Sequence, residues 1–492
     1  MNPKTPPAPY QPARLPTGIA GLDTVLDGGF LRGGIYIVQG QPGAGKTIFG
    51  NQICFGHAAA GGKALYVTLL AENHARMLMH MRTLSFFEPA ALPASLAYIS
   101  AFQALEDDGL EGLLELLLRE VVAQGATVLV LDGLVAAQEH AGTQIDLKKF
   151  IHRLQTAASL VDCTIFLLTS AQNQFVSPEH TMVDGIVALS DAVDGDAAWR
   201  AERQLEIRKF RGSPHLRGRH AYRIGADGIE VFPRIEGLYA RPAAAPPRPD
   251  LRPVSTGVGV LDAMLGGGLA PGSTTLVVGP PGIGKTTLAL HFLGGCGEAE
   301  PGLLFGFAEP PARLLAKTDA LALGLRARLD ERSVEILWQP ATEGVLDQLG
   351  DRLMAHVRRR GVRRLVVDGL AGLEQATAEP GRIRRFCTAL ANELRDLGVT
   401  SLYTVEAEEM LGALPGAPLG GALGRGVSIS AENLVLMRYL EARSLLHRVI
   451  SIVKARDSDF DAGQREFAVT GRGLVVDATS ERAQALTGGG PA

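Results

Sequence analysis

The chain has 492 residues, of which 46% are hydrophobic and 20% are charged, and its formal net charge is -4. One hydrophobic core stops growing at roughly 250–300 residues, so this length predicts two domains. The composition excludes a disordered chain, and the net charge excludes non-specific attraction of the whole chain to nucleic acid.

The N-terminal residues 1–14 are rich in proline and lack the apolar core of a signal peptide. No apolar run reaches the roughly 18 residues that span a bilayer. The four cysteines are far apart and form no CxxC pair, which disfavours a disulfide framework or a zinc site. We therefore expect a flexible N-terminal segment, no membrane partner and a cytoplasmic location.

The rest of the chain contains a duplication. Each half opens with TG, LD and GG at the same spacing, and the same later motifs follow in the same order. Lys46 and Lys285 are 239 residues apart, and Asp132 and Asp368 are 236 apart. Several motifs at nearly one offset indicate an internal repeat.

A stretch rich in proline and alanine, without helical or strand periodicity, separates the two copies. The predicted boundaries place domain 1 at residues 15–237, the linker at 238–253, domain 2 at 254–478 and a flexible tail at 479–492.

Within each half, short apolar runs typical of buried strands alternate with helical patterns. Residues 35–40 and 274–279 are such runs and precede glycine-rich loops, while residues 164–170 and 400–406 follow helical stretches. This alternation predicts βαβ units, so each domain should be an α/β fold with a mostly parallel sheet flanked by helices.

Both glycine-rich loops fit the P-loop pattern GxxxxGK[ST]. Glycines let backbone N–H groups surround a phosphate, the following helix directs its positive end at it, and the lysine reaches the β- and γ-phosphates. The predicted ATP-binding residues are Gly40, Gln41, Pro42, Gly43, Ala44, Gly45, Lys46 and Thr47, and in the second copy Gly279, Pro280, Pro281, Gly282, Ile283, Gly284, Lys285, Thr286 and Thr287.

A magnesium site is predicted beside each P-loop. The hydroxyl of Thr47 or Thr286 should coordinate Mg²⁺. Asp132 and Asp368 each end an apolar run, where an aspartate supports the metal from a neighbouring strand. The alternative for these aspartates is a helix cap or turn residue.

These motifs together resemble the KaiC family of the RecA superfamily. The lead-in TG-xxx-LD-xx-L-x-GG occurs twice, and the resemblance covers residues 15–235 and 253–478. It implies tandem RecA-like P-loop NTPase domains in a homo-hexameric ring, with ATP between neighbouring subunits.

The resemblance also implies that a Lys-x-Arg pair reaches across each interface to the neighbour's nucleotide. The matching residues are Lys209 and Arg211 in domain 1, and Lys454 and Arg456 in domain 2. A cation donated in this way neutralises charge that develops on the γ-phosphoryl group. The alternative is a solvated charge pair at a strand end.

The chain departs from the family at a pair of glutamates that polarise the attacking water. Ala71-Glu72 and Ala308-Glu309 occupy the pair, and domain 1 needs a one-residue insertion before it. Glu72 and Glu309 are candidate general bases, or else exposed loop residues. We therefore expect slow turnover, with ATP mainly stabilising the assembled ring.

The second domain of the best-known family members phosphorylates itself. Ser428 matches their phosphorylated serine, Ile429 replaces the threonine, and Ser430 lies close by. Ser428 and Ser430 are candidate phosphorylation sites, and a structural serine is the alternative. Little sequence follows Val476, where the clock protein of this family has a long tail that engages its activating partner. We therefore expect a signalling ATPase with an unidentified regulatory protein partner and not a full circadian oscillator.

Two other functions remain as alternatives. One is a RecA- or RadA-like DNA-dependent ATPase, for which the candidate basic element is residues 356–365. No aromatic residue interleaves with its arginines, and a solvated helix end is the preferred interpretation, so a nucleic-acid partner is not expected. The other is a structural ATP-binding ring that does not hydrolyse ATP.

Overall fold

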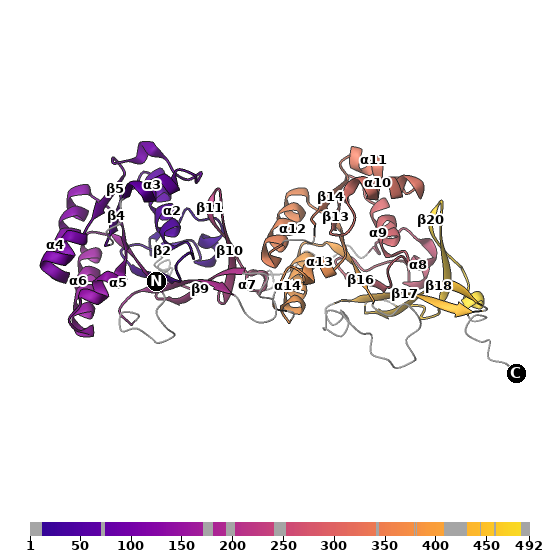
Figure 1. Cartoon of the computed structure of the whole chain (residues 1–492). Coiled ribbons are helices and arrows are strands. Elements are labelled where there is room, and N and C mark those ends of the chain that lie inside the picture. The colour runs from indigo at the N-terminus through magenta and orange to yellow at the C-terminus, as the bar shows by residue number, and fades with distance from the viewer. Residues whose placement is uncertain are drawn as a thin grey trace, which may run out of the picture. The chain divides into compact units, whose positions relative to one another are not determined.

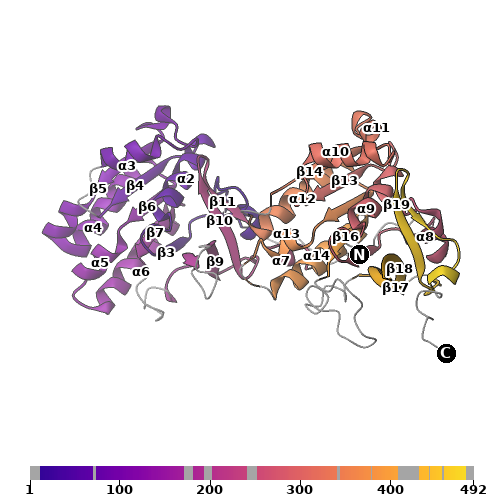
Figure 2. The ribbon, with the colours of Figure 1, turned by 45° about the vertical axis from the view of Figure 1, so that its right-hand side comes forward.

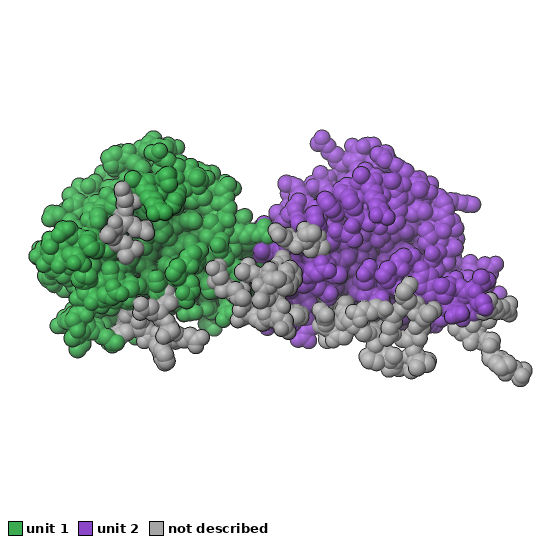
Figure 3. Space-filling view, viewed as in Figure 1, with its two compact units in different colours: residues 1–237 green, residues 238–492 purple. Residues whose placement is uncertain are grey.

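The computed structural model describes residues 12–69, 74–170, 181–192, 202–240, 252–340, 344–377, 379, 381–407, 431–442, 444–456 and 459–483. The chain forms two compact units, residues 1–237 and 238–492 (Figure 3). Three candidate site residues, Glu72, Ser428 and Ser430, lie outside the described residues, as does most of the predicted linker. Within the described ranges, none of the helices combines the length and the apolarity that a membrane crossing requires.

The first unit alternates strands and helices along the chain, as predicted (Figure 1). Its elements are β1 (Arg14–Leu15), α1 (Leu22–Val25), β2 (Phe30–Leu31), β3 (Ile35–Gly40), α2 (Lys46–Ala59), β4 (Ala64–Thr68), α3 (His74–Met81), η1 (Pro89–Ala91), β5 (Leu96–Ser100), α4 (Phe102–Gln124), β6 (Val128–Asp132), α5 (Leu134–His140), α6 (Gln144–Leu160), β7 (Thr164–Ser170), β8 (Gly185–Ala192), β9 (Glu202–Phe210), β10 (Arg219–Gly225), β11 (Gly228–Phe232) and α7 (Ile235–Leu238).

A nine-stranded sheet organises the described part of this unit, in the order β11-β10-β9-β8-β3-β7-β6-β4-β5. The strands from β8 to β5 are parallel, and β9, β10 and β11 continue the sheet in antiparallel pairs. Because β3 and β6 are parallel in one sheet, the loops that follow Gly40 and Asp132 leave from the same edge.

Helices cover both faces of this sheet (Figure 2). Apolar residues of α4, α5 and α6 pack on the face that includes Ile37 and Leu131. Apolar residues of α2 pack on the opposite face, against Val38 and Val130. Neighbouring residues of one strand thus face different helices, which explains why the central strands read as continuous apolar runs.

The second unit repeats this element order. Its elements are α8 (Gly259–Met264), β12 (Thr274–Gly279), α9 (Lys285–Gly294), β13 (Gly302–Gly306), α10 (Pro311–Ala320), α11 (Leu325–Asp330), β14 (Val334–Trp338), α12 (Leu346–Arg360), β15 (Arg364–Asp368), α13 (Ala371–Glu374), α14 (Arg382–Asp396), β16 (Thr400–Glu406), β17 (Asn433–Ala442), β18 (Leu445–Ala455), β19 (Arg465–Thr470) and β20 (Gly473–Val476).

The sheet of the second unit has the order β14-β13-β15-β16-β12-β17-β18-β19-β20 among its described strands. It matches the first sheet strand for strand, with six parallel strands followed by three antiparallel ones. The duplication seen in the sequence is therefore a duplication of topology. Both domains have the RecA-like architecture that the sequence predicted.

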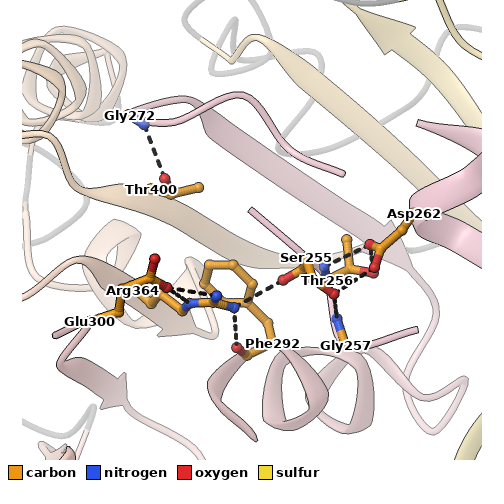
Figure 4. A network of polar contacts seen from close by, with 9 residues as sticks. All are labelled: Ser255, Thr256, Gly257, Asp262, Gly272, Phe292, Glu300, Arg364 and Thr400. Atoms are coloured by element: carbon orange, nitrogen blue, oxygen red, sulfur yellow. Dashed lines mark hydrogen bonds and ion pairs between the residues drawn. The ribbon is translucent and has the colours of Figure 1, made fainter. Parts of the chain in front are cut away.

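The shared lead-in motif has a structural role. Asp23 accepts a hydrogen bond from the backbone N–H of Thr17 at 2.9 Å. Asp262 accepts the corresponding bond from Thr256 at 2.7 Å and a second one from the Thr256 hydroxyl at 2.6 Å (Figure 4). In each copy the aspartate closes the turn that leads the chain into the domain.

Figure 4 also shows a buried arginine that supports this turn in domain 2. Arg364 is 7% exposed and bonds Glu300 at 2.7 Å and the carbonyl oxygens of Ser255 and Phe292 at 3.0 and 3.2 Å. The prediction of a solvated helix end for residues 356–365 holds for α12, which ends at Arg360, but is wrong for Arg364, because this side chain belongs to β15 and is buried.

The packed part of the chain extends past the predicted domain boundaries at 15 and 478. Arg14 lies in β1 and donates to the carbonyl oxygens of Leu26 and Gly29, both at 2.9 Å. Ala483, inside the predicted tail, is 1% exposed.

The four cysteines are buried and form no disulfides. Burial raises the pKa of every one of these thiols.

Candidate functional site

Each P-loop joins a central strand to a helix. Gly43 and Gly45, which lie before α2, have φ values of 86° and 90°. Their counterparts Gly282 and Gly284, before α9, have φ values of 73° and 126°. Residues other than glycine rarely adopt this backbone conformation, so the glycines of the motif are required for the loop to curl around an anion.

The P-loop lysines take the same position in both domains. Lys46 is the first residue of α2, and its Nζ donates to the carbonyl oxygens of Gly40 and Gln41 at 2.8 and 3.1 Å. Lys285 repeats the arrangement with the two corresponding carbonyl oxygens, at 2.8 and 2.9 Å. Burial lowers the pKa of both ammonium groups, so a phosphate in the loop would compensate a partly desolvated charge.

The structure brings the predicted metal residues together in both domains. The Thr47 hydroxyl donates to Asp132 at 3.1 Å, and the Thr286 hydroxyl donates to Asp368 at 3.2 Å. A hydroxyl and a carboxylate side by side are oxygen ligands of the type that Mg²⁺ takes beside nucleotide phosphates. In the described part of the chain, no group of three or more His, Cys, Asp or Glu forms another metal site.

The two aspartates are held by side chains that the sequence did not predict. The Tyr66 hydroxyl on β4 donates to Asp132 at 2.7 Å. The Thr404 hydroxyl on β16 donates to Asp368 at 2.6 Å. The strand of each aspartate has a neighbour on either side. The hydroxyl donor comes from the neighbour on one side in domain 1 and from the neighbour on the other side in domain 2. Burial raises the pKa of Asp368, and the hydroxyl of Thr404 counteracts part of this rise.

In domain 1 these residues line a cavity of about 410 Å³. Its wall includes Lys46, Thr47 and Asp132, together with His74 and Thr68. The last two residues belong to no sequence motif, so the pattern gave no signal for them.

The candidate base Glu309 lies three residues after β13. Gly306 pairs with Asp368, whereas in domain 1 Thr68 pairs with Asp132, so Glu72 is one residue further from its strand, in agreement with the predicted insertion. Glu309 forms an ion pair with Lys317 of α10 at 3.1 Å. Its charge contributes to the raised pKa of Asp368, after the larger effect of burial.

Both Lys-x-Arg pairs follow a β-bulge. Lys209 pairs with Ile186 just before the register of β8 and β9 shifts. Lys454 pairs with Leu434 just before the same shift between β17 and β18. A bulge re-aims the side chains next to it, and it recurs at the same place in both domains.

The structure separates Lys209 from the P-loop of its own domain. Lys209 pairs with Ile186 of β8, and Ile186 pairs in turn with Ile37 of β3. Ile37 lies three residues before Gly40, where the P-loop begins. This is about 10 Å along the strand and, across two strands, about 10 Å sideways. In domain 2 Lys454 lies level with the third residue before the loop in the same way.

Each lysine instead donates a hydrogen bond to the segment just before the strand that it pairs with, which is β8 in domain 1 and β17 in domain 2. Lys209 and Arg211 donate to the carbonyl oxygen of Thr181 at 3.2 and 3.1 Å. Lys454 donates to the carbonyl oxygen of Ala431. Burial and the neighbouring arginine lower the pKa of both lysines.

The arginines at the end of α12 are close to carboxylates. Arg358 pairs with Glu393 at 2.6 Å, and Arg359 and Arg360 lie 3.8 and 3.6 Å from Glu335. Three arginines therefore face two carboxylates, so their positive charge is partly balanced within the domain.

Two doubly wound sheets, each with a P-loop at the end of its central strand and an aspartate at the end of a nearby strand, define a tandem P-loop NTPase of the RecA type. A family model described as "ATPase: KaiC" matches residues 15–236 and 254–481. The chain belongs to the KaiC ATPase family.

Curated relatives extend along nearly the whole chain. A circadian clock oscillator protein KaiC from Parasynechococcus marenigrum (strain WH8102) is 24% identical over 98% of this chain and 93% of its own length. One from Thermostichus vulcanus is 24% identical over 97% of this chain and 92% of its own. The KaiC 1 protein of Synechocystis sp. is 23% identical over 97% and 92%.

Proposed function

We propose that this protein binds ATP with magnesium at both P-loops, hydrolyses it slowly, and acts as a signalling or regulatory ring with a cytoplasmic protein partner. The observation that carries the proposal is the repeated site. Both domains have the same lysine and hydroxyl–aspartate geometry, and neither site has lost a residue of the phosphate or metal set.

Each site divides the work among this chain's residues. The loop amides and Lys46 or Lys285 bind the phosphates and draw negative charge away from the γ-phosphoryl group. Thr47 with Asp132, and Thr286 with Asp368, would hold Mg²⁺, which supplies charge neutralisation between the β- and γ-phosphates. In domain 2, Glu309 is the candidate that orients the attacking water.

The Lys-x-Arg pairs support a homo-hexameric ring with nucleotide at the interfaces. Because Lys209 and Lys454 lie at the opposite end of the sheet from their own P-loops, a role in catalysis requires another subunit. A closed ring gives every P-loop such a neighbour. The single glutamate at each base position supports slow turnover, since Ala71 and Ala308 lack a carboxylate.

The experiment is to measure released phosphate and phosphate retained on the protein from γ-labelled ATP with Mg²⁺. The wild type is compared with Ser428→Ala, Ser430→Ala and the double variant Lys46→Ala/Lys285→Ala. Release that the double variant abolishes supports the ATPase. If labelled phosphate stays on the wild-type protein but not on Ser428→Ala, domain 2 also phosphorylates its own serine.

The opposite results separate the alternatives. Tight ATP binding without any release, in a stable assembly, identifies a structural ring. Hydrolysis that DNA stimulates in a salt-sensitive way identifies a DNA-dependent ATPase. The ion pairs of Arg358, Arg359 and Arg360 argue against this second outcome, because two carboxylates already neutralise part of that charge.

A further inference from the structure

Domain 1 contains a histidine in the wall of its nucleotide cavity. His74 is the first residue of α3, and its Nε2 lies 2.7 Å from the Oγ1 of Thr68 at the end of β4. The same cavity is lined by Lys46, Thr47 and Asp132. Helix α3 therefore brings an imidazole to the cavity that holds the phosphate and metal residues.

The position of the imidazole is at the metal end of that cavity. Thr68 pairs with Asp132 across β4 and β6, so the hydroxyl that bonds His74 lies on the strand next to the aspartate. Asp132 in turn accepts from Thr47 at the start of α2. A nucleotide whose β- and γ-phosphates lie on the P-loop would direct its terminal phosphate toward this wall.

The chemistry of the site suits a proton acceptor. Burial lowers the pKa of His74, so the ring is neutral near pH 7. Among the described residues, the charged and titratable groups that share its cavity or contact its ring are Lys46 on α2, Asp132 on β6, and Tyr98 on β5, whose ring centroid lies 6.0 Å away. The Tyr98 hydroxyl donates to Asn51 at 2.6 Å, and burial raises its pKa beyond the range in which it titrates in cells.

Domain 2 has different chemistry at this place. The first residue of α10 is Pro311, which has no proton to exchange. The carboxylate near Asp368 is Glu309, paired with Lys317. The two sites therefore differ in their titratable groups although their loops and metal residues match.

We propose that His74 contacts the terminal phosphate and the attacking water of ATP in domain 1, and accepts the water proton during hydrolysis. The inference rests on the ATP hydrolysis proposed above. The water oxygen bonds to the γ-phosphorus, the bond from this phosphorus to the ADP oxygen breaks, and one water proton moves to Nδ1 of the imidazole, whose Nε2 is bonded to the Thr68 hydroxyl. ADP and inorganic phosphate leave, and the imidazolium returns its proton to solvent.

The kinetic test uses the full chain with Lys285→Ala, so that domain 1 alone turns over. His74→Gln is compared with His80→Gln, which changes an exposed histidine of the same helix. We expect kcat to fall about 100-fold for His74→Gln and to stay unchanged for His80→Gln. The acid limb of the pH–rate profile should also disappear in His74→Gln, whereas a merely structural residue would leave its shape intact. Unchanged kcat and an unchanged profile would overturn the proposal, and a loss confined to Glu72→Gln would assign the base to Glu72.

A second measurement tests contact without turnover. Diethyl pyrocarbonate modifies accessible imidazoles, and mass spectrometry reads His74 and His80 separately. We expect saturating Mg²⁺ and a slowly hydrolysed ATP analogue to protect His74 several-fold and to leave His80 unchanged. Equal modification of His74 with and without bound nucleotide refutes the contact. If the parent binds the analogue but releases no phosphate from ATP, the ATPase proposal fails while the protection pattern still decides whether His74 touches the nucleotide.

Discussion

If the Lys-x-Arg cations act on a neighbouring subunit, two inactive variants should restore each other. One variant carries Lys285→Ala, which removes the P-loop lysine of domain 2, and the other carries Lys454→Ala. Both are made in a Lys209→Ala background, which leaves nucleotide in domain 1 for assembly but silences its turnover. Each variant alone should lose at least about 100-fold of domain 2 turnover, since each lacks one charge-stabilising group.

The expected recovery follows from the geometry. Because Lys454 lies level with the third residue before the loop and two strands to the side, it cannot serve the P-loop of its own chain. In an equal mixture an interface is active when an intact P-loop meets an intact Lys454, which happens at about one quarter of random interfaces. Phosphate release should therefore recover to about one quarter of that of the Lys209→Ala parent.

The assay is steady-state phosphate release after mixing the subunits without nucleotide and assembling them with Mg²⁺ and ATP. Size-exclusion chromatography with light scattering verifies that mixed assemblies form. Activity in the mixture that stays at the sum of the two variants, although the subunits have mixed, would refute action between subunits.

Three further predictions concern individual contacts in domain 2. Thr404→Val removes a hydrogen bond to Asp368 and should raise the Mg²⁺ concentration for half-maximal turnover about tenfold, because a hydrogen bond to a charged group contributes about 1.5 kcal/mol; an unchanged Mg²⁺ titration would contradict it. Arg364→Met should lower the free energy of unfolding of domain 2 by about 2–4 kcal/mol in urea, since it leaves buried carbonyl oxygens without a donor; a change below about 0.5 kcal/mol would show that these bonds contribute little. His291 accepts a hydrogen bond from the Leu474 backbone N–H, and burial lowers its pKa. The stability of domain 2 should therefore be constant above pH of about 6.5, the usual pKa, and fall as the pH drops below it; a His291→Gln variant should lose this part of the pH dependence.

The sequence was sufficient for the residues that form local patterns. The P-loop is a contiguous motif, and each aspartate ends a contiguous apolar run, so local patterns predicted residues that the fold then brings together across 85 residues in domain 1 and 82 in domain 2. The repeat also predicted that both sheets would be alike, and the strand orders agree.

Contacts between distant segments were beyond the sequence. Asp132 is held by Tyr66 and Asp368 by Thr404, and only the order of the strands reveals that these hydroxyls are neighbours of the aspartates. His74 was not predicted, because a lone histidine forms no motif with a recognisable spacing. Arg364 looked like one more surface charge because it ends a run of arginines in which Arg359 and Arg363 are exposed, and its burial follows from the start of β15.

The shielding of all four native thiols gives this chain a practical property. A protonated, buried thiol reacts slowly with maleimides, so one cysteine placed at an exposed site would carry nearly all of an added dye. Leu160 in domain 1 and Leu446 in domain 2 are 82% and 62% exposed, and a donor and an acceptor fluorophore there would report the distance between the two halves while ATP is added. No native cysteine would first have to be removed from the cores.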